Sequence, residues 1–217
     1  MLRVIVVGAG VVGYSVAYEL AIRGAHVRVI DPRGSGQGAT RASAGILAPH
    51  IEGHSGALLR LGLCSLDQYA SFIARISSDS GRDVEYRRTG TLQVAFDDDE
   101  VQALDRQHRS LADAGVSHSL LHGDEARRLE PGLAEGIRAG LLIPQHGYVH
   151  AASLMTALVE GAARRGVTLS VARVDAIDNG DEELRVVTAD QSIAAEAVVI
   201  AAGSWSGGIP GKRAQSP

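Results

Sequence analysis

Cysteine and aromatic residues are scarce in this chain. Cys64 is the only cysteine among 217 residues, which excludes an internal disulfide. We expect its side chain to be a small buried group in the helix around residues 58–76. Aromatic residues make up 4% of the chain and do not interleave with a basic cluster, and the net charge is −4. These features argue against nucleic acid as a main partner.

Long apolar runs are also missing. No segment approaches the ~18 apolar residues that are needed to span a bilayer. The apolar residues near the N-terminus are too few, and too soon followed by glycines, to form a signal peptide. We therefore expect no membrane segment and a cytoplasmic location. A chain of this length has room for one sizeable core and a smaller appended domain.

The sequence does have a glycine-rich turn between a short apolar run and a helix. Residues 3–7 have the composition of a buried parallel strand. Gly8 permits a tight turn, Gly10 lets the backbone approach a diphosphate, and Gly13 lets the following helix pack closely on the strand. The helix, predicted over residues 11–23, offers its N–H groups and its positive dipole end to the same anion.

An acidic residue stands where such a unit needs one. Residues 26–30 form a second apolar strand, and Asp31 follows it, 23 residues after Gly8. Its carboxylate is placed to accept hydrogen bonds from a ribose hydroxyl. Strand, glycines, helix, strand and acid in this order predict a dinucleotide-binding βαβ unit. The alternative is a βαβ unit that binds nothing.

The middle of the chain has a different pattern. Residues 34–49 are rich in glycine and other small residues, as expected where backbone lies against a flat ligand, and an amphipathic helix follows over residues 55–79. Further elements are predicted as a strand over 86–96 bent at Gly90, helices over 97–114 and 123–129, and a strand over 139–144. The acids at 97–100 suggest either a metal site or a helix N-terminus, and we favour the helix.

The last third returns to the pattern of the first. A helix over 154–165 precedes strands at 167–171, 174–177, 184–188 and 197–202, with a polar turn at 178–183. We therefore predict an α/β protein with a Rossmann-like dinucleotide-binding domain, discontinuous over 1–85 and 145–208. A small α+β insert occupies 86–144, and the tail at 209–217 is irregular.

Other chemistry has little support in the sequence. His50 and His54 are four residues apart, but nearby Pro49 and Gly53 oppose a helix, so we expect no metal there. His146 and His150 flank Gly147, and we interpret them as surface-loop histidines. No Ser-His-Asp grouping stands out.

Four motifs together carry a resemblance to a known family. They are Val6-Val7-Gly8-Ala9-Gly10-Val11-Val12-Gly13, Ala42-Ser43-Ala44-Gly45-Ile46-Leu47-Ala48-Pro49-His50-Ile51-Glu52, Arg88-Thr89-Gly90-Thr91-Leu92 and Val198-Val199-Ile200-Ala201-Ala202-Gly203-Ser204-Trp205-Ser206. In order and spacing, the chain resembles the flavin-dependent amino-acid oxidase superfamily, and most closely the glycine oxidases of thiamine biosynthesis. The resemblance extends to about Gly208, so the insert corresponds to part of a substrate domain.

The resemblance implies FAD as cofactor and a set of residues that contact it. Gly8, Gly10 and Gly13, with Val12, would hold the diphosphate, and Asp31 the adenosine ribose. Eight further contacts are implied along the rest of the cofactor: Thr40, Arg41, Ala42, Gly45, Ile46, Val174, Ala202 and Gly203. The implied reaction transfers hydrogen from a small amino acid or amine to the flavin, and oxygen then yields peroxide.

The chain departs from the family pattern in one respect. Family members continue for well over a hundred further residues, which supply the arginine that binds the substrate carboxylate, so we expect a truncated chain. Arg87 and Arg88 are poor substitutes, and the catalytic residues stay unassigned. The alternatives are a non-catalytic FAD-binding fragment or one half of a split oxidase. As partners we expect either further copies in a homo-oligomer or a complementing C-terminal chain. An NAD-dependent dehydrogenase is disfavoured because residues 40–47 match a flavoprotein segment.

Overall fold

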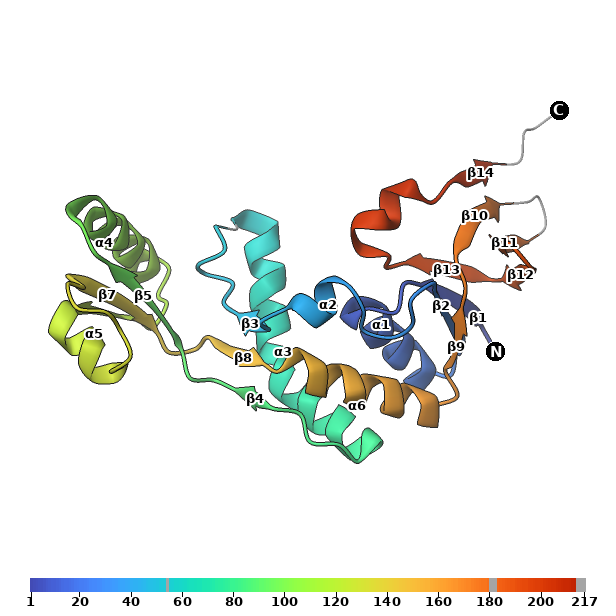
Figure 1. Ribbon diagram of the computed structural model, residues 1–217, viewed down its shortest axis with the longest axis horizontal. Coiled ribbons are helices and arrows are strands. Elements are labelled where there is room, and N and C mark those ends of the chain that lie inside the picture. The colour runs from blue at the N-terminus through green and yellow to red at the C-terminus, as the bar shows by residue number, and fades with distance from the viewer. Residues whose placement is uncertain (54, 180–182, 214–217) are drawn as a thin grey trace. The chain divides into compact units, whose positions relative to one another are not determined.

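A computed structural model describes residues 1–53, 55–179 and 183–213 of the chain (Figure 1). The chain divides into two compact units. The first unit holds Met1–Gly45, Tyr69–Glu85 and His150–Pro217, and the second holds Ile46–Gln68 and Tyr86–Val149. Helix α3 (Gly56–Ser80) begins in the second unit and ends in the first.

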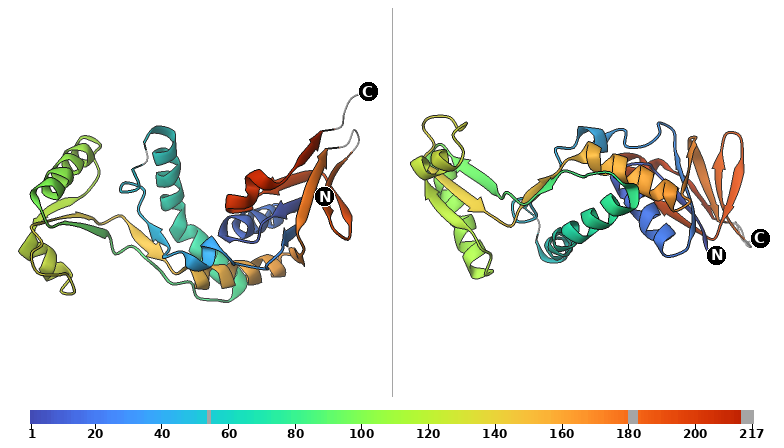
Figure 2. Two further views of the ribbon diagram at one scale, coloured as in Figure 1. Left: turned by 45° about the horizontal axis from the view of Figure 1, so that its top comes forward. Right: turned by 90° about the horizontal axis from the view of Figure 1, so that it is seen from below.

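A parallel sheet with strand order β13-β1-β2-β9 forms the centre of the first unit. Its elements are β1 (Arg3–Val7), α1 (Val11–Ile22), β2 (His26–Asp31), α2 (Ala39–Ala42), α6 (Ala151–Arg164), β9 (Thr168–Val171) and β13 (Ala197–Ile200). Residues Val4–Val7 are all buried, as expected for a central parallel strand. Helices α1 and α6 pack together (Figure 2).

Close helix packing in the first unit depends on one small residue. A Cβ on Gly161 of α6 would lie 2.6 Å from Cδ1 of Ile76 and 3.6 Å from the ring of Tyr18. The Tyr18 hydroxyl donates to Asp79 at 2.7 Å, and Arg165 pairs with the same carboxylate at 2.6 Å. Residues from α1, α3 and the end of α6 are thereby joined by apolar contact and by charge.

A second sheet of the first unit has the strand order β12-β11-β10-β14. Its elements are β10 (Val174–Asn179), β11 (Leu184–Thr188), β12 (Ser192–Ala195) and β14 (Gly211–Arg213), with the 3-10 helix η1 (Gly203–Gly208) before β14. Val186 and Ala195 of this sheet pack with Ile5, Val7 and Ile30 in one apolar core. We had expected residues 209–217 to form an irregular tail. Instead β14 pairs in parallel with β10, because β10 offers an open edge on that side.

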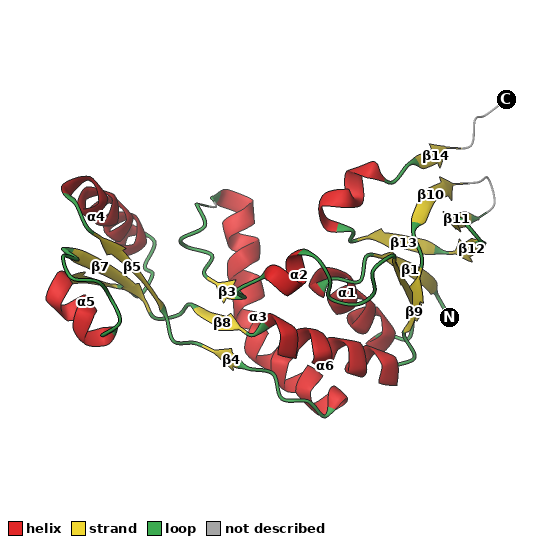
Figure 3. Cartoon of the chain, in the orientation of Figure 1, coloured by secondary structure: helices red, strands yellow, loops and turns green. Residues whose placement is uncertain are grey.

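The second unit is built from antiparallel strands. Its elements are β3 (Ile46–Leu47), β4 (Tyr86–Arg87), β5 (Thr91–Ala95), α4 (Asp98–Asp113), β6 (Ser119–His122), α5 (Gly123–Leu129), β7 (Ala139–Ile143) and β8 (Gly147–Val149). Two sheets result, with orders β3-β8-β4 and β5-β7-β6. Alternate residues of β7 face different helices: Leu141 packs with Leu104 of α4, and Gly140 lies against Ala126 of α5 (Figure 3).

One segment belongs to a different unit from the one that we predicted from the sequence. Residues 46–68 lie with the insert, whereas we assigned them to the dinucleotide domain. The reason is strand pairing, because β3 pairs with β8 through Ile46–Tyr148 and Leu47–Gly147. The polar turn expected at 178–183 begins later, since Asp178 and Asn179 still belong to β10, and residues 180–182 lie outside the described residues.

Candidate dinucleotide-binding site

The glycine turn lies at the carboxyl ends of three neighbouring parallel strands. Gly8 follows β1 directly and has φ +112°, a conformation that favours glycine. Its N–H donates to the carbonyl of Ile30 at 2.8 Å, and Ala201 donates to the carbonyl of Val7 at 2.7 Å. The ends of β2, β1 and β13 are thus tied together, at the edge where α/β sheets bind ligands.

Two of the three glycines are required by close backbone packing. A Cβ on Gly8 would lie 2.3 Å from the carbonyl oxygen of Ala201, and one on Gly13 would lie 1.9 Å from the carbonyl oxygen of Gly8. Gly10 differs from both, because the nearest atom to its Cβ position is Oγ1 of Thr40 at 3.1 Å. The backbone at Gly10 therefore faces the loop that carries Thr40 and is not packed against buried backbone as Gly8 and Gly13 are.

The N-terminus of α1 faces the same loop. Gly10 is its N-cap, and the first intrahelical bond runs from Tyr14 N to the carbonyl of Gly10. The N–H of Val11 donates to Oγ1 of Thr40 at 3.0 Å. The N–H groups of Val12 and Gly13 precede the first intrahelical bond and have no acceptor within the helix. Two N–H groups and the positive dipole end of α1 are available to an anion.

Asp31 connects the strand end to the glycine loop. One carboxylate oxygen accepts from Ala9 N at 3.1 Å, and the other accepts from Arg33 N at 2.8 Å. Each oxygen keeps a further lone pair. The carboxylate therefore fixes the loop and is still able to accept a ribose hydroxyl. The predicted contact to ribose stays a prediction.

The small-residue segment contributes a short helix to the first unit. Thr40 is half-buried, whereas Arg41 and Ala42 are exposed on α2. Gly45 has φ +69° and donates to the side chain of Ser43 at 3.0 Å. Ile46, expected beside the flavin ring, is 59% exposed and belongs to the second unit.

The remaining predicted contacts lie near the strand ends of the first unit. Val174 begins β10, shortly after Ala172 donates to the carbonyl of Asp31 at 3.2 Å. Ala202 is the N-cap of η1, and its N atom would lie 2.9 Å from a Cβ on Gly8. Gly203 is exposed and has φ +57°. A glycine cradle, a free helix N-terminus and a carboxylate one strand away fit a dinucleotide such as FAD.

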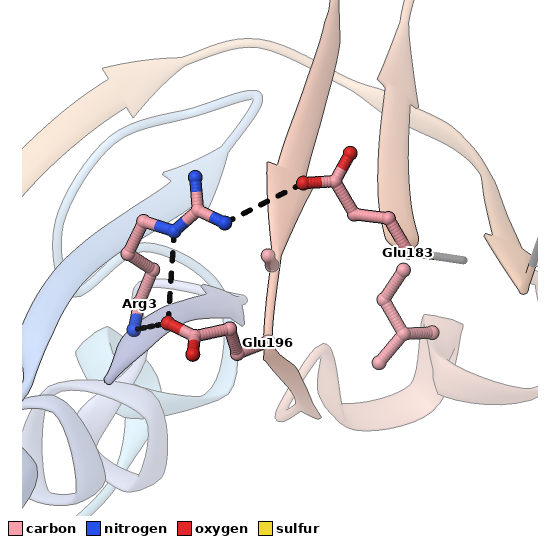
Figure 4. A pocket seen from close by; sticks show the side chains of 5 residues that line it. Arg3, Glu183 and Glu196 are labelled. Carbon is pink, nitrogen blue, oxygen red and sulfur yellow. Dashed lines mark hydrogen bonds and ion pairs between the residues drawn. The ribbon is translucent and has the colours of Figure 1, made fainter. Parts of the chain in front are cut away.

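A pocket of about 530 Å³ lies elsewhere in the first unit, lined by Arg3, Glu183, Leu184, Ala195 and Glu196 (Figure 4). Arg3 starts β1, so this pocket is at the amino end of the strand whose carboxyl end carries Gly8. The Arg3 guanidinium pairs with Glu183 at 3.4 Å and Glu196 at 3.6 Å, and the Arg3 N–H holds the pKa of Glu196 below its usual value. Both carboxylates are paired with arginine, since Glu183 also pairs with Arg185 at 3.0 Å, so these exposed groups serve one another rather than a ligand.

A buried polar chain in the second unit was missed by sequence reasoning. His146 is fully buried: its Nε2 lies 2.8 Å from Nδ1 of His50, and its Nδ1 lies 2.7 Å from Oγ1 of Thr91. Burial lowers the pKa of His146 to about 4, with further lowering by the nearby charges of His50 and Arg88. Burial also lowers the pKa of His50. The expectation of a surface loop was wrong for His146, because β3–β8 pairing brings residues 96 positions apart together.

Two further expectations, for Cys64 and for the acids at 97–100, have outcomes in the structure. Cys64 is exposed on α3, so the prediction of a buried small side chain was wrong. The acids at 97–100 start α4, and Asp97 accepts from Glu100 N at 2.9 Å as its N-cap. Within the described residues, no group of three or more His, Cys, Asp or Glu could hold a metal ion; His54 lies outside them. No helix of the described part is long and apolar enough to cross a membrane.

Comparisons with known proteins agree with this geometry. The chain is 31% identical over 207 residues to glycine oxidase of Bacillus licheniformis, covering 94% of this chain and 55% of that protein. It is 29% identical over 207 residues to the bifunctional protein ThiO/ThiG of Synechocystis, covering 94% of this chain and 30% of that protein. The crystal structure of glycine oxidase from Geobacillus kaustophilus matches with a TM-score of 0.90 and 31% identity, over 95% of this chain and 57% of that one.

The chain therefore spans about half the length of the glycine oxidases that it matches. The family described as FAD dependent oxidoreductase matches residues 3–217. Because that match includes the glycine turn, Asp31 and nearly everything that follows, this chain belongs to the family of FAD dependent oxidoreductases.

Proposed function

We propose that this chain supplies the FAD-binding part of an oxidase for a small amino acid of the glycine or sarcosine type. The observation that carries the proposal is the glycine turn at the carboxyl ends of β13, β1 and β2, with the N-terminus of α1 and Asp31 beside it. Relatives named glycine oxidase at about 30% identity support the substrate class. A place in thiamine biosynthesis, a soluble cytoplasmic location and the list of cofactor contacts belong to the same proposal.

The residues of the first unit bind and orient the cofactor. Val12 N–H and Gly13 N–H would hold diphosphate oxygens, and Asp31 would hold the adenosine ribose. When bound, FAD supplies an acceptor for two electrons from the substrate carbon. A substrate carboxylate needs a fixed cation, and we assign none here, because Arg88 already donates to the carbonyl of Leu66 at 3.3 Å and to the hydroxyl of Tyr86 at 3.3 Å.

The alternative proposal is a cofactor-binding piece that is catalytic only with a second chain, or not at all. It is favoured by one observation, which is that Arg88 is already engaged by Leu66 and Tyr86 and leaves a substrate carboxylate without an assigned cation. Both proposals require FAD to be retained, and they differ in turnover.

The test is to load the purified protein with FAD and add glycine or sarcosine without oxygen. Bleaching of the flavin absorbance, followed by peroxide formation in air, supports the oxidase. Retention of FAD without bleaching supports the alternative. In that case, adding a complementing chain should make the flavin bleach with substrate. A protein that binds NAD tightly and never takes up FAD would refute both.

A further inference from the structure

Arg33 and Trp205 contact each other next to the glycine turn. The guanidinium carbon of Arg33 lies 4.5 Å from the centre of the Trp205 ring. Arg33 follows the end of β2, and Trp205 is in η1 after the end of β13. In the sheet order β13-β1-β2, those two strands flank β1 and are separated by roughly 10 Å. The two side chains therefore approach each other from opposite sides of the turn at Gly8.

The backbone of Arg33 places its side chain at the adenosine end of the cradle. Its N–H donates to Asp31 at 2.8 Å, so Arg33 belongs to the turn whose carboxylate would hold the ribose. Its guanidinium lies against Gly38, where a Cβ would be 3.1 Å from Nη2. Gly38 precedes α2, whose Thr40 accepts from Val11 at the helix terminus. The guanidinium thus lies along the loop that joins the ribose carboxylate to the diphosphate end.

The guanidinium of Arg33 has no carboxylate partner among the described residues. None of the ion pairs formed within residues 1–53, 55–179 and 183–213 includes Arg33. Asp31, the nearest acid in sequence, accepts the backbone N–H of Arg33 and forms no ion pair with its guanidinium. The indole of Trp205 is 60% exposed even with Arg33 against it, so part of its surface is free for a flat ligand.

We propose that Arg33 and Trp205 form a clasp for the adenosine diphosphate half of the cofactor. The free surface of the indole stacks on the purine, and the guanidinium donates to a phosphate oxygen, as a planar group with several N–H donors does well. This inference rests on the proposed dinucleotide site. It adds that recognition depends on the adenosine half, so ADP alone binds and FMN does not occupy the clasp.

The experiment uses intrinsic fluorescence, because Trp205 is the only tryptophan of the 217 residues. ADP is titrated into the full chain without flavin, and the emission of Trp205 is quenched as the site fills. FMN, which has no adenosine, is tested by calorimetry instead, and at the same concentrations it leaves the affinity for ADP unchanged. FAD affinity is measured separately by calorimetry, so a flavin that quenches tryptophan over a distance does not confuse the result.

Variants separate charge from shape. Arg33→Ala weakens ADP and FAD binding about tenfold, which corresponds to the loss of one hydrogen bond to a charged phosphate oxygen. Arg33→Lys keeps the charge without the plane and recovers only part of that loss. Trp205→Phe keeps a ring and binds almost as well, whereas Trp205→Ala does not. Arg82→Ala is the control, because Arg82 pairs with Glu160 at 2.8 Å, and it binds like the parent.

The outcomes distinguish the clasp from the site itself. If the parent binds FAD but ADP leaves Trp205 emission unchanged, or if Arg33→Ala binds both ligands like the parent with an unchanged circular dichroism spectrum, the clasp is wrong and the site stands. Displacement of ADP by FMN at the same concentrations, measured by calorimetry, also overturns the clasp. If the parent binds neither ADP nor FAD, the proposed function fails and the clasp with it.

Discussion

The two units of this protein fix their polar groups in different ways. In the first unit, backbone geometry creates the site: Gly8, Gly10 and Asp31 occupy adjacent strand ends, and the parallel order brings them together. In the second unit, side chains from distant segments meet through antiparallel pairing, as His50 and His146 do. A site made by backbone and glycine has a local sequence signature, whereas a site made by side-chain partners depends on a register that the sequence does not display.

A substitution at Gly13 should destabilise the first unit more than any other change considered below. Gly13→Ala places a Cβ 1.9 Å from the carbonyl oxygen of Gly8, so α1 must move away from β1. We expect a loss of at least about 3 kcal/mol in the free energy of unfolding, together with the loss of FAD binding. Urea denaturation followed by circular dichroism measures the first effect.

Gly10→Ala is the matched variant. Its Cβ would contact only Oγ1 of Thr40, at 3.1 Å, so the free energy of unfolding should change by less than about 1 kcal/mol. FAD binding should nevertheless be lost, because the methyl group stands between the backbone and the diphosphate. If Gly10→Ala binds FAD like the parent, the loop does not lie at the phosphates.

The buried histidine predicts an acid-sensitive second unit. The pKa of His146 is about 4 in the folded protein and near 6.5 in the unfolded chain, so the unfolded chain binds a proton that the folded one does not. Stability contributed by neutral His146 is complete above pH 6.5 and decreases as the pH falls toward 4, by up to about 3 kcal/mol. His50 acts in the same direction, because its pKa is also lowered.

The measurement is the free energy of unfolding at a series of pH values between 4 and 7. His146→Gln should remove most of the decrease, since glutamine does not titrate. His150→Gln is the control, because His150 is exposed and caps α6 by accepting from Ser153 at 3.3 Å. An equal pH dependence in the parent and in His146→Gln would show that the decrease arises elsewhere.

Asp31 tests whether the first unit uses its carboxylate for ligand as well as for structure. Asp31→Ala removes an acceptor for Ala9 N and Arg33 N and for a ribose hydroxyl. We expect FAD binding to weaken by roughly 1.5–3 kcal/mol, the range for hydrogen bonds to a charged group. Calorimetry gives the affinity, and Asp31→Asn, which keeps one carbonyl acceptor, should lose less. An unchanged FAD affinity in Asp31→Ala would show that Asp31 does not bind the ribose.

Sequence reasoning was most successful where a local rule decides the structure. The α/β fold, the FAD dependent family and FAD as its cofactor are confirmed. Helix α5 was predicted with its observed bounds, and α1 ends one residue before the predicted Arg23, because Gly24 stops it with φ +85°. The short strands β3, β8 and β12 were missed, since pairing partners rather than propensity define them.

Cys64 and His146 show why burial was the weakest inference. The periodicity of α3 places Cys64 on a helix, but only the neighbours of that helix decide whether the side chain is covered. His146 follows Gln145 and precedes Gly147, a polar and turn-like setting, yet it is fully buried and its ring nitrogens contact His50 and Thr91. The predicted cofactor contacts remain predictions, because backbone geometry fits a dinucleotide without identifying each contact.

Asp97 and Asp31 both accept backbone N–H groups, but we expect only Asp31 to serve the cofactor. Asp97 in the second unit resembles Asp31 in accepting a backbone N–H, here that of Glu100 at 2.9 Å, while Glu100 accepts from Phe96 N at 2.7 Å. Because this is a helix N-cap, Asp97→Ala should lower the free energy of unfolding by about 1 kcal/mol and leave FAD affinity unchanged. Asp99→Ala, in the first turn of the same helix, should cost only a few tenths of a kcal/mol, since it loses a dipole interaction alone. Denaturant unfolding and FAD titration of both variants measure these two effects.

A loss of FAD affinity in Asp97→Ala as large as in Asp31→Ala would mean that the acids at 97–100 serve the cofactor rather than the helix. The division of roles between the two units would then be wrong.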